Sequence, residues 1–308
     1  GILLSHNGIL LETSFSALME HCYHNILGSC AEVFKSDFPI RFDFLDTIEG
    51  GNLSIQCHPR AEYIRSKFGK DYTQDETYYI VKCSPDARVY LGFQDNIDKV
   101  EFAAALRKSQ EESKALEITD YVQSHPASKH ELFLIPNGTI HASGAGNLVL
   151  EISSAPYIFT FKMYDWVRLD MDGRPRPINI DHGLANVRFD RKGQVVQDTL
   201  ISHPYVMEDK ADYRKEHVPT HRDHFYDVHR YTLHKGGKVV IDEKDKVHVW
   251  MIVEGQHAEL ITSCGRKYGY NYLETFIVPA SAGTYTVVNN GDEDVVLVKA
   301  FVKDNFIL

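Results

Sequence analysis

Short stretches rich in β-branched and aromatic residues dominate the chain between residues 53 and 166. Gly, Asn, Asp or Pro stand at the ends of these stretches, which is typical of strands bounded by turns. We expect strands at residues 53–59, 77–83, 87–93, 130–136, 148–153 and 157–166. Many short strands separated by turn residues favour a β-sandwich or barrel.

Two stretches follow a helical pattern instead. Residues 11–35 space their apolar side chains at helical intervals and contain no proline, and residues 97–123 include a helix-like run with a strongly polar outer face. We therefore expect a helix in each of these stretches, within a chain that is otherwise mainly β.

A second block of strand-like runs begins near residue 225, after a polar stretch at residues 170–190. The sequences of the two blocks resemble each other weakly. Residues 130–141 and 273–285 share an apolar run that ends in Pro, a turn of small residues and a returning strand. We interpret this as two barrels built on one plan. Tyr285 stands where the first block has His141, so we expect the second barrel to lack a metal site.

Composition narrows the class of protein. The 33 basic and 43 acidic residues give a formal net charge of −10, which argues against nucleic acid as a partner. The five cysteines are scattered without a CxxC pair, which favours free thiols in a reducing compartment. No apolar run reaches the ~18 residues that a membrane span needs, and no signal peptide opens the chain. We expect a cytoplasmic protein without a membrane partner; its oligomeric state stays open.

Four residues form a candidate metal site. Gln56 and His58 point to the same side of a strand, since side chains alternate with period 2. A tight Asn-Gly turn precedes His141, and Glu76 at the start of another strand could add one carboxylate. This mixed set of nitrogen and oxygen ligands suits Zn²⁺, with Co²⁺, Ni²⁺ or Mn²⁺ as further options. A single negative ligand would leave the ion a strong Lewis acid.

The order of motifs resembles that of a known family. The chain reads FPIRFDFLDT, LSIQCHP, ETYYIV, LIPNGTIHASGAGNLVLEIS and FTFKMYDWVR. Over residues 38–190, and more weakly beyond, this series is similar to the type I mannose-6-phosphate isomerases, which are zinc-dependent cupins. The resemblance implies two cupin (jelly-roll) barrels and one zinc ion per chain, held by Gln56, His58, Glu76 and His141 in the first barrel.

The resemblance also implies a reaction. Such an enzyme is an aldose–ketose isomerase that moves a proton between C1 and C2, for mannose 6-phosphate and fructose 6-phosphate or a related sugar. Glu151 matches an active-site position of the family, either as the proton-transfer base or as a carboxylate that orients a ligand or a strand. Lys162 stands where the family has an arginine and keeps a cation over the site.

Two further departures concern charge. Gln74 replaces the Lys that usually precedes the zinc-binding Glu by two residues, and Asp43 replaces another Lys. A sugar phosphate carries roughly two negative charges, so fewer cations weaken the case for that substrate. Arg168 or Arg65 could supply phosphate contacts, although Arg65 is better interpreted as a solvated surface charge.

Alternative functions follow from these departures. A non-catalytic cupin that binds a carbohydrate and regulates would keep the metal site without the cations. A cupin oxidoreductase would need redox-active iron bound by two His and one carboxylate, and the presence of Gln56 in the ligand set argues against this function. Four histidines lie close together in the sequence: His217, His221, His224 and His229. For these residues a pH-sensitive surface loop is favoured over a second metal site.

The expected domain organisation has three parts. Residues 1–37 form a helical segment. The usual opening segment of the family is not recognisable there, so these residues either replace that segment or are the tail of a missing region. Residues 38–190 form the metal-binding cupin domain, and residues 191–308 form the second, metal-free one.

Overall fold

The computed structural model describes residues 2–70, 72–155, 160–242 and 245–305. Its contacts divide the chain into two compact units. One comprises residues 41–203 with 220–224, and the other comprises residues 1–40, 204–219 and 225–308. We call them the 41–203 unit and the 225–308 unit. The division differs from the expected boundaries at 37 and 190, because the N-terminal segment packs with the C-terminal strands.

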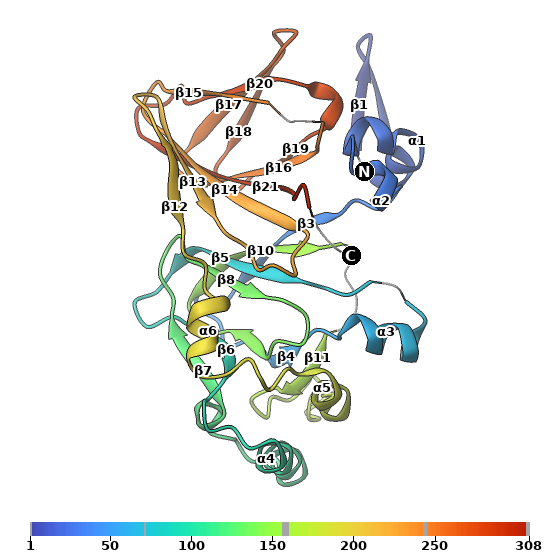
Figure 1. Cartoon of the computed structure of the whole chain (residues 1–308), viewed down its shortest axis with the longest axis vertical. Coiled ribbons are helices and arrows are strands. Elements are labelled where there is room, and N and C mark those ends of the chain that lie inside the picture. Colours follow the sequence, from blue (N-terminus) through green and yellow to red (C-terminus); the bar gives the residue numbers. More distant parts are fainter. Residues whose placement is uncertain (1, 71, 156–159, 243–244, 306–308) are drawn as a thin grey trace. The chain divides into compact units, whose positions relative to one another are not determined.

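Two antiparallel sheets build the 41–203 unit (Figure 1). The four-stranded sheet has the order β3(Ile40–Asp46), β10(Asn147–Ser154), β5(Glu76–Cys83), β8(Leu132–Ile135). The five-stranded sheet has the order β11(Phe161–Tyr164), β4(Ile55–Cys57), β9(His141–Ser143), β6(Arg88–Phe93), β7(Val122–Pro126). The predicted mainly β, cupin-like fold is confirmed, with paired sheets in place of a closed barrel. Residues 157–159 of the last predicted strand lie outside the described residues.

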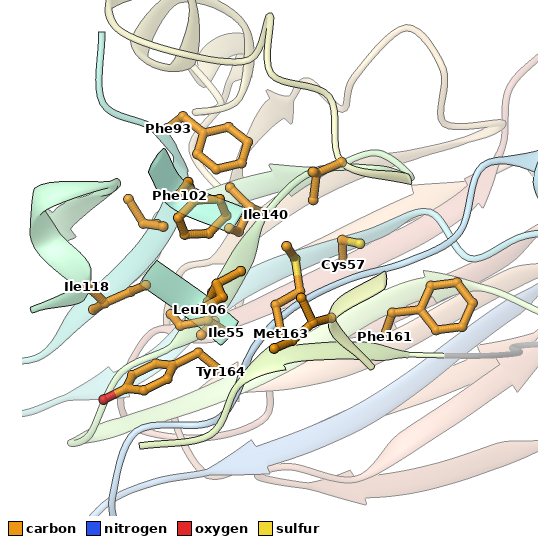
Figure 2. Close-up of a cluster of buried hydrophobic side chains, with 14 residues drawn as sticks. Ile55, Cys57, Phe93, Phe102, Leu106, Ile118, Ile140, Phe161, Met163 and Tyr164 are labelled. Atoms are coloured by element: carbon orange, nitrogen blue, oxygen red, sulfur yellow. The ribbon is translucent and has the colours of Figure 1, made fainter. Parts of the chain in front are cut away.

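One hydrophobic cluster covers the outer face of the five-stranded sheet. Figure 2 shows Cys57, Phe161 and Met163 of the sheet together with Phe102 and Leu106 of helix α4(Lys99–Glu112) in this cluster. Since strand side chains alternate, Gln56 and Lys162, the neighbours of Cys57 and Phe161, point to the opposite face, toward the interior of the sandwich. The apolar layer under the helix thereby fixes which polar residues face inward.

A second cluster fills the space between the two sheets. It includes Tyr78, Val89, Leu91 and Phe133, all almost fully buried. Burying large apolar side chains contributes about 1.5–3 kcal/mol each. This core gives the inward-facing polar groups a rigid, water-poor frame.

The helix predicted at residues 97–123 is confirmed only in part. Helix α4 begins after Asp98, whose side chain accepts hydrogen bonds from the N–H groups of Val100 and Glu101. It ends at Ser113, which adopts a left-handed backbone with φ 52°. The remaining residues form η1(Ile118–Asp120) and the start of β7. The other helices of this unit are α3(Ala61–Phe68), α5(Ile180–Asn186) and α6(Gln194–Thr199).

The 225–308 unit also contains two larger sheets. The six-stranded sheet has the order β12(Tyr205–Asp209), β13(Tyr213–Val218), β14(Tyr226–Leu233), β21(Val295–Val302), β16(His248–Glu254), β19(Thr275–Val278). The four-stranded sheet has the order β15(Lys238–Ile241), β20(Tyr285–Val288), β17(His257–Thr262), β18(Lys267–Asn271). A short 3₁₀ helix, η2(Ala280–Ala282), precedes β20.

The N-terminal segment of this unit differs from the single helix expected at residues 11–35. A hairpin of β1(Ile2–His6) and β2(Ile9–Thr13) comes first. Helix α1(Phe15–Leu27) follows, with Ser14 accepting a hydrogen bond at its start, and Gly28 ends it at φ 60°. Helix α2(Ala31–Phe34) is a single further turn. In the described ranges, no helix is long and apolar enough to cross a membrane.

The four clustered histidines do not form one surface loop, contrary to the sequence interpretation. His217 and His229 are directly paired across strands β13 and β14. His221 and His224 belong to the 41–203 unit, and His224 is almost fully buried. Strand pairing, which the sequence spacing did not reveal, separates them into two environments.

Candidate metal centre

Residues from both sheets of the 41–203 unit meet at one buried point. Glu76, at the start of β5, lies with Oε2 3.0 Å from Nε2 of His58 and with Oε1 2.9 Å from Nε2 of His141. All three side chains are at most 2% exposed. Their ligand atoms lie within 4.8 Å of one another, an arrangement that could hold a metal ion.

The protonation of His141 supports this interpretation. Its Nδ1 lies 2.9 Å from the carbonyl oxygen of Thr139, which can only accept, so Nδ1 carries the proton. In the neutral ring Nε2 then presents a lone pair toward the carboxylate of Glu76. Two electron pairs face each other stably only when a proton or a cation lies between them. Metal-binding imidazoles in proteins typically donate their other N–H to a carbonyl in this way.

A hydrogen-bonded turn before β9 positions His141. Gly138 adopts φ 76°, which suits glycine, and its N–H donates to the carbonyl oxygen of His58 at 2.9 Å. The Thr139 hydroxyl donates to the Pro136 carbonyl at 2.6 Å, closing the turn. The turn therefore links the backbone after β4 to the start of β9, and it keeps the imidazoles of His58 and His141 close together.

Gln56 lies beside the cluster, paired directly with His141 across β4 and β9. Its Nε2 is 3.3 Å from Nε2 of His141, while its Oε1 accepts a hydrogen bond from Ser54 at 3.0 Å. A half-turn of the amide would exchange these atoms and direct the oxygen toward the cluster. The structure thus brings all four predicted ligands together, with Gln56 in an orientation that favours its neighbour Ser54.

The charge on Glu76 is well stabilised. Burial alone would raise its pKa, but without a metal the positive charge of His58 and His141 in their protonated forms, with the hydrogen bonds that they donate, outweighs burial and holds the pKa well below its usual value. An ionised carboxylate between two imidazoles is a donor set typical of zinc and other divalent transition metals.

Glu151 is a second buried carboxyl group, on strand β10 next to β5. Its Oε1 accepts hydrogen bonds from Arg41 Nη1 and Gln74 Nε2, each at 3.2 Å. Gln74 also donates to Glu76 Oε2 at 2.9 Å, so one amide links the two carboxyl groups. Burial, together with the charge of Glu76, raises the pKa of Glu151 to about 8. A carboxyl group that titrates near neutral pH is suited to proton transfer.

Lys162 lies on the inner face of the five-stranded sheet, beside Gln56. It is the direct partner of Gln56 across β11 and β4, so both side chains occupy the same inner face. The five-stranded sheet thus presents Lys162, Gln56 and His141 side by side on three adjacent strands.

The two arginines considered for phosphate contacts have a structural role or lie at the surface, and two aromatic residues nearby in the sequence pack on the outer face of the sheet. Arg168 binds Asp165 three residues away, and Arg65 is exposed on α3. Trp166 donates to the Leu53 carbonyl at 2.8 Å and packs on the outer cluster, as Tyr164 does. These side chains hold the sheet and its helices together.

Arg41 is the functional candidate that the sequence reasoning missed. It is 29% exposed and binds Glu151 and also Asp43, two residues along the same strand. Alternation along β3 was the available signal, because it puts residues 41 and 43 on one face. The structure therefore places the guanidinium of Arg41 next to Glu151. Arg41 also lies beside Asp43, the position at which the family resemblance implies a lysine.

The two antiparallel sheets and the buried His–Glu–His cluster between them define a cupin-type fold with a candidate metal centre. No model of a protein family matches the chain. In sequence it is 24% identical over 258 residues to the probable mannose-6-phosphate isomerase GmuF of Bacillus subtilis, covering 81% of this chain and 72% of that protein. It is 28% identical over 178 residues to the mannose-6-phosphate isomerase ManA of the same organism, covering 58% and 52%.

Solved structures show the same fold. The mannose 6-phosphate isomerase from Bacillus subtilis superposes with a TM-score of 0.76 at 18% identity, covering 95% of this chain and 83% of that one. A mutant phosphomannose isomerase from Salmonella typhimurium gives a TM-score of 0.71 at 15% identity, covering 96% and 87%. The resemblance that the motifs indicated is therefore confirmed, by sequence relatives and by fold.

Proposed function

We propose that this protein is a zinc-dependent aldose–ketose isomerase that interconverts mannose 6-phosphate and fructose 6-phosphate, or a closely related sugar pair. The observation that carries the proposal is the buried cluster of His58, Glu76 and His141 with a second buried carboxyl group, Glu151, beside it. The relatives named above are mannose-6-phosphate isomerases, which supports the same reaction class.

The proposed metal ligands are Gln56, His58, Glu76 and His141, with one zinc ion per chain. The lone pair that His141 Nε2 directs at Glu76 supports a cation at this place. Bound zinc would supply a Lewis acid that polarises the sugar carbonyl and stabilises negative charge on its oxygen.

The proposed proton-transfer group is Glu151. Isomerisation removes a proton from one carbon and returns it to the next, so the group must accept and then release a proton. The raised pKa of Glu151 suits both steps. Arg41 and Gln74 hold its carboxyl group by two hydrogen bonds and so fix its orientation.

Cations near the site bear on the choice of a phosphorylated substrate. Gln74 and Asp43 remove two positive charges relative to the family, but Arg41 and Lys162 remain beside the cluster. We propose that these two cations favour an anionic sugar and that Lys162 contacts it as the second catalytic candidate.

A non-catalytic carbohydrate-binding cupin is the second candidate function. The specific observation in its favour is Gln74, because a neutral amide bridges the two carboxyl groups where the family has an ammonium. Such a protein would keep the metal and bind the sugar without turning it over.

The test is to load the full chain with zinc and follow mannose 6-phosphate and fructose 6-phosphate by NMR, with free mannose and fructose in parallel. We expect interconversion of the phosphorylated pair. Glu151→Gln should keep stoichiometric zinc and lose activity by about 100-fold or more, the usual contribution of a general base. A zinc-loaded wild-type chain that turns over none of these sugars would exclude the isomerase and leave the binding protein.

A further inference from the structure

A buried arginine lies against the turn at residues 136–139, which precedes β9 and His141. Arg191 lies between α5 and α6 and is only 8% exposed. Its Nη1 donates to the carbonyl oxygen of Pro136 at 2.7 Å and to that of Asn137 at 2.6 Å. The same nitrogen donates to the hydroxyl oxygen of Thr139 at 2.5 Å. One guanidinium nitrogen thus binds three oxygens of a single turn.

These contacts are the main compensation for burying the charge of Arg191. A buried charge costs free energy unless it is paired and hydrogen-bonded. The nearest carboxylate oxygen to Nη2 belongs to Asp223, at 3.7 Å, and Asp223 is 41% exposed. A partly exposed ion pair at this distance stabilises little. The guanidinium therefore depends on the turn, and the carbonyls of the turn depend on the guanidinium.

A buried carboxylate holds an N–H group of the same turn. Asp75 directly precedes Glu76 and is 9% exposed. Its Oδ1 accepts from the backbone N–H of Asn137 at 2.6 Å and from Asn137 Nδ2 at 2.9 Å. The position of Asp75 is itself fixed, because its N–H donates to the hydroxyl oxygen of Ser154 at 2.9 Å. The turn is therefore held by a carboxylate next to Glu76 and by the guanidinium of Arg191.

Thr139 connects Arg191 to the imidazole of His141. The Thr139 hydroxyl accepts from Arg191, and the carbonyl oxygen of the same residue accepts from His141 Nδ1 at 2.9 Å. This second bond fixes the tautomer in which Nε2 faces Glu76. A rotation of the Thr139 carbonyl would remove the acceptor and leave the imidazole free to turn. Because Arg191 binds the Thr139 side chain and two further carbonyls, it opposes that rotation.

We propose that Arg191 is a positioning residue for the candidate metal centre: by binding the turn, it keeps the Thr139 carbonyl directed at His141 Nδ1 and His141 Nε2 directed at the metal. The inference rests on the proposed function, because it requires a metal ion at this centre. Arg191 itself touches neither the metal ligands nor the substrate in this proposal.

The experiment measures metal binding to the chelator-treated full chain. Arg191→Met removes the guanidinium and keeps a long, unbranched side chain. We expect this variant to bind zinc about 10- to 100-fold more weakly than wild type in competition with a chelating dye, the usual effect of losing a group that orients a metal ligand. Co²⁺ is the second probe, because its visible absorption reports the geometry of its ligands, and we expect an altered cobalt spectrum.

The two metal probes separate positioning from general stability. A residue that only stabilised the fold would lower the free energy of unfolding in urea, but it would leave the zinc affinity and the cobalt spectrum of the folded chain unchanged. Arg191→Lys supplies an ammonium that can donate to the same oxygens of the turn. It should therefore bind zinc more tightly than Arg191→Met and restore the cobalt spectrum toward that of wild type.

Arg188→Met is the matched control. The Arg188 side chain is 45% exposed and pairs with Asp190. Its backbone N–H donates to the Gly138 carbonyl oxygen at 2.8 Å, and this bond is kept in the variant. The control therefore removes a positive charge three residues from Arg191 without removing a bond to the turn, and it should bind zinc and cobalt like wild type.

If Arg191→Met does not fold, Thr139→Val tests the same link, because it keeps the shape of Thr139 and removes the hydroxyl that Arg191 binds. It should also weaken zinc binding and alter the cobalt spectrum. Unchanged zinc affinity with an unchanged cobalt spectrum, in whichever of these two variants folds, would overturn the proposal. An equal loss in Arg188→Met would overturn it too. A wild-type chain that binds neither zinc nor cobalt would instead exclude the metal centre, and with it the proposed function.

Discussion

Glu151→Gln in the metal-free protein tests the electrostatics of the candidate site directly. The Glu151 carboxyl group has its pKa raised from 4.5 to about 8 in the folded chain, mainly by burial and then by the charge of Glu76. Between these values the folded state keeps a proton that the unfolded state has lost. Raising the pH therefore favours unfolding in this window, and the loss is complete above the folded-state pKa.

The magnitude follows from one proton. Its release on unfolding changes the free energy of unfolding by about 1.4 kcal/mol per pH unit, so this group lowers stability by about 2–3 kcal/mol between about pH 5 and about pH 7. Glutamine has the same shape and no proton to lose, and its amide oxygen can still accept from Arg41 and Gln74. The variant should therefore lack this part of the pH dependence.

The assay is urea unfolding of chelator-treated protein at a series of pH values. The quantity to compare is the difference between wild type and Glu151→Gln, because every other titrating group is present in both chains. Glu62→Gln, at an exposed position of α3, is the control and should follow the wild type. Parallel curves for wild type and Glu151→Gln would refute the reasoning, since the folded carboxyl group would then be ionised and the contacts to Arg41 and Gln74 would outweigh burial.

Three further outcomes follow from the same site. Gln74→Lys puts an ammonium between the two carboxyl groups, which should lower the pKa of Glu151 and flatten the same pH dependence in urea unfolding. His141→Ala should lose stoichiometric zinc and isomerase activity together in metal analysis and NMR, and retained full zinc would contradict the ligand assignment. Gly138→Ala forces a side chain onto a backbone at φ 76° and to 2.8 Å from the Asn186 carbonyl oxygen, so it should cost about 1–3 kcal/mol in urea unfolding and weaken zinc binding; unchanged values of both would contradict the role of the turn.

Much of the strand pattern followed from local chemistry. Runs such as residues 77–83 and 148–153 became β5 and β10 within one or two residues, because β-branched and aromatic side chains suit a pleated surface and turn residues end it. Helix ends were less predictable. A left-handed backbone at Ser113 ended α4, and Gly28 ended α1 with a positive φ of 60° in a different conformation, although the apolar spacing ran further.

Part of the candidate site was also predictable from local geometry. Period-2 alternation predicted Gln56 and His58 on one side of a strand, the Asn-Gly turn predicted the position of His141, and the structure brings these side chains together. Glu76 is different, since it lies on the other sheet and no local rule connects it to these residues; the family resemblance, rather than spacing, pointed to it.

The sequence by itself determined the β-rich class and made Gln56, His58 and His141 candidate ligands, because these depend on residue type, on alternation along one strand and on a local turn; the family resemblance added Glu76. Only the tertiary structure decided that Arg41 and Gln74 meet Glu151, and that Arg191 binds the turn before His141. Those neighbours come from segments far apart in the chain. Their contacts depend on which strands pair and in what register, and that is settled by packing of the whole sheet rather than by any one segment.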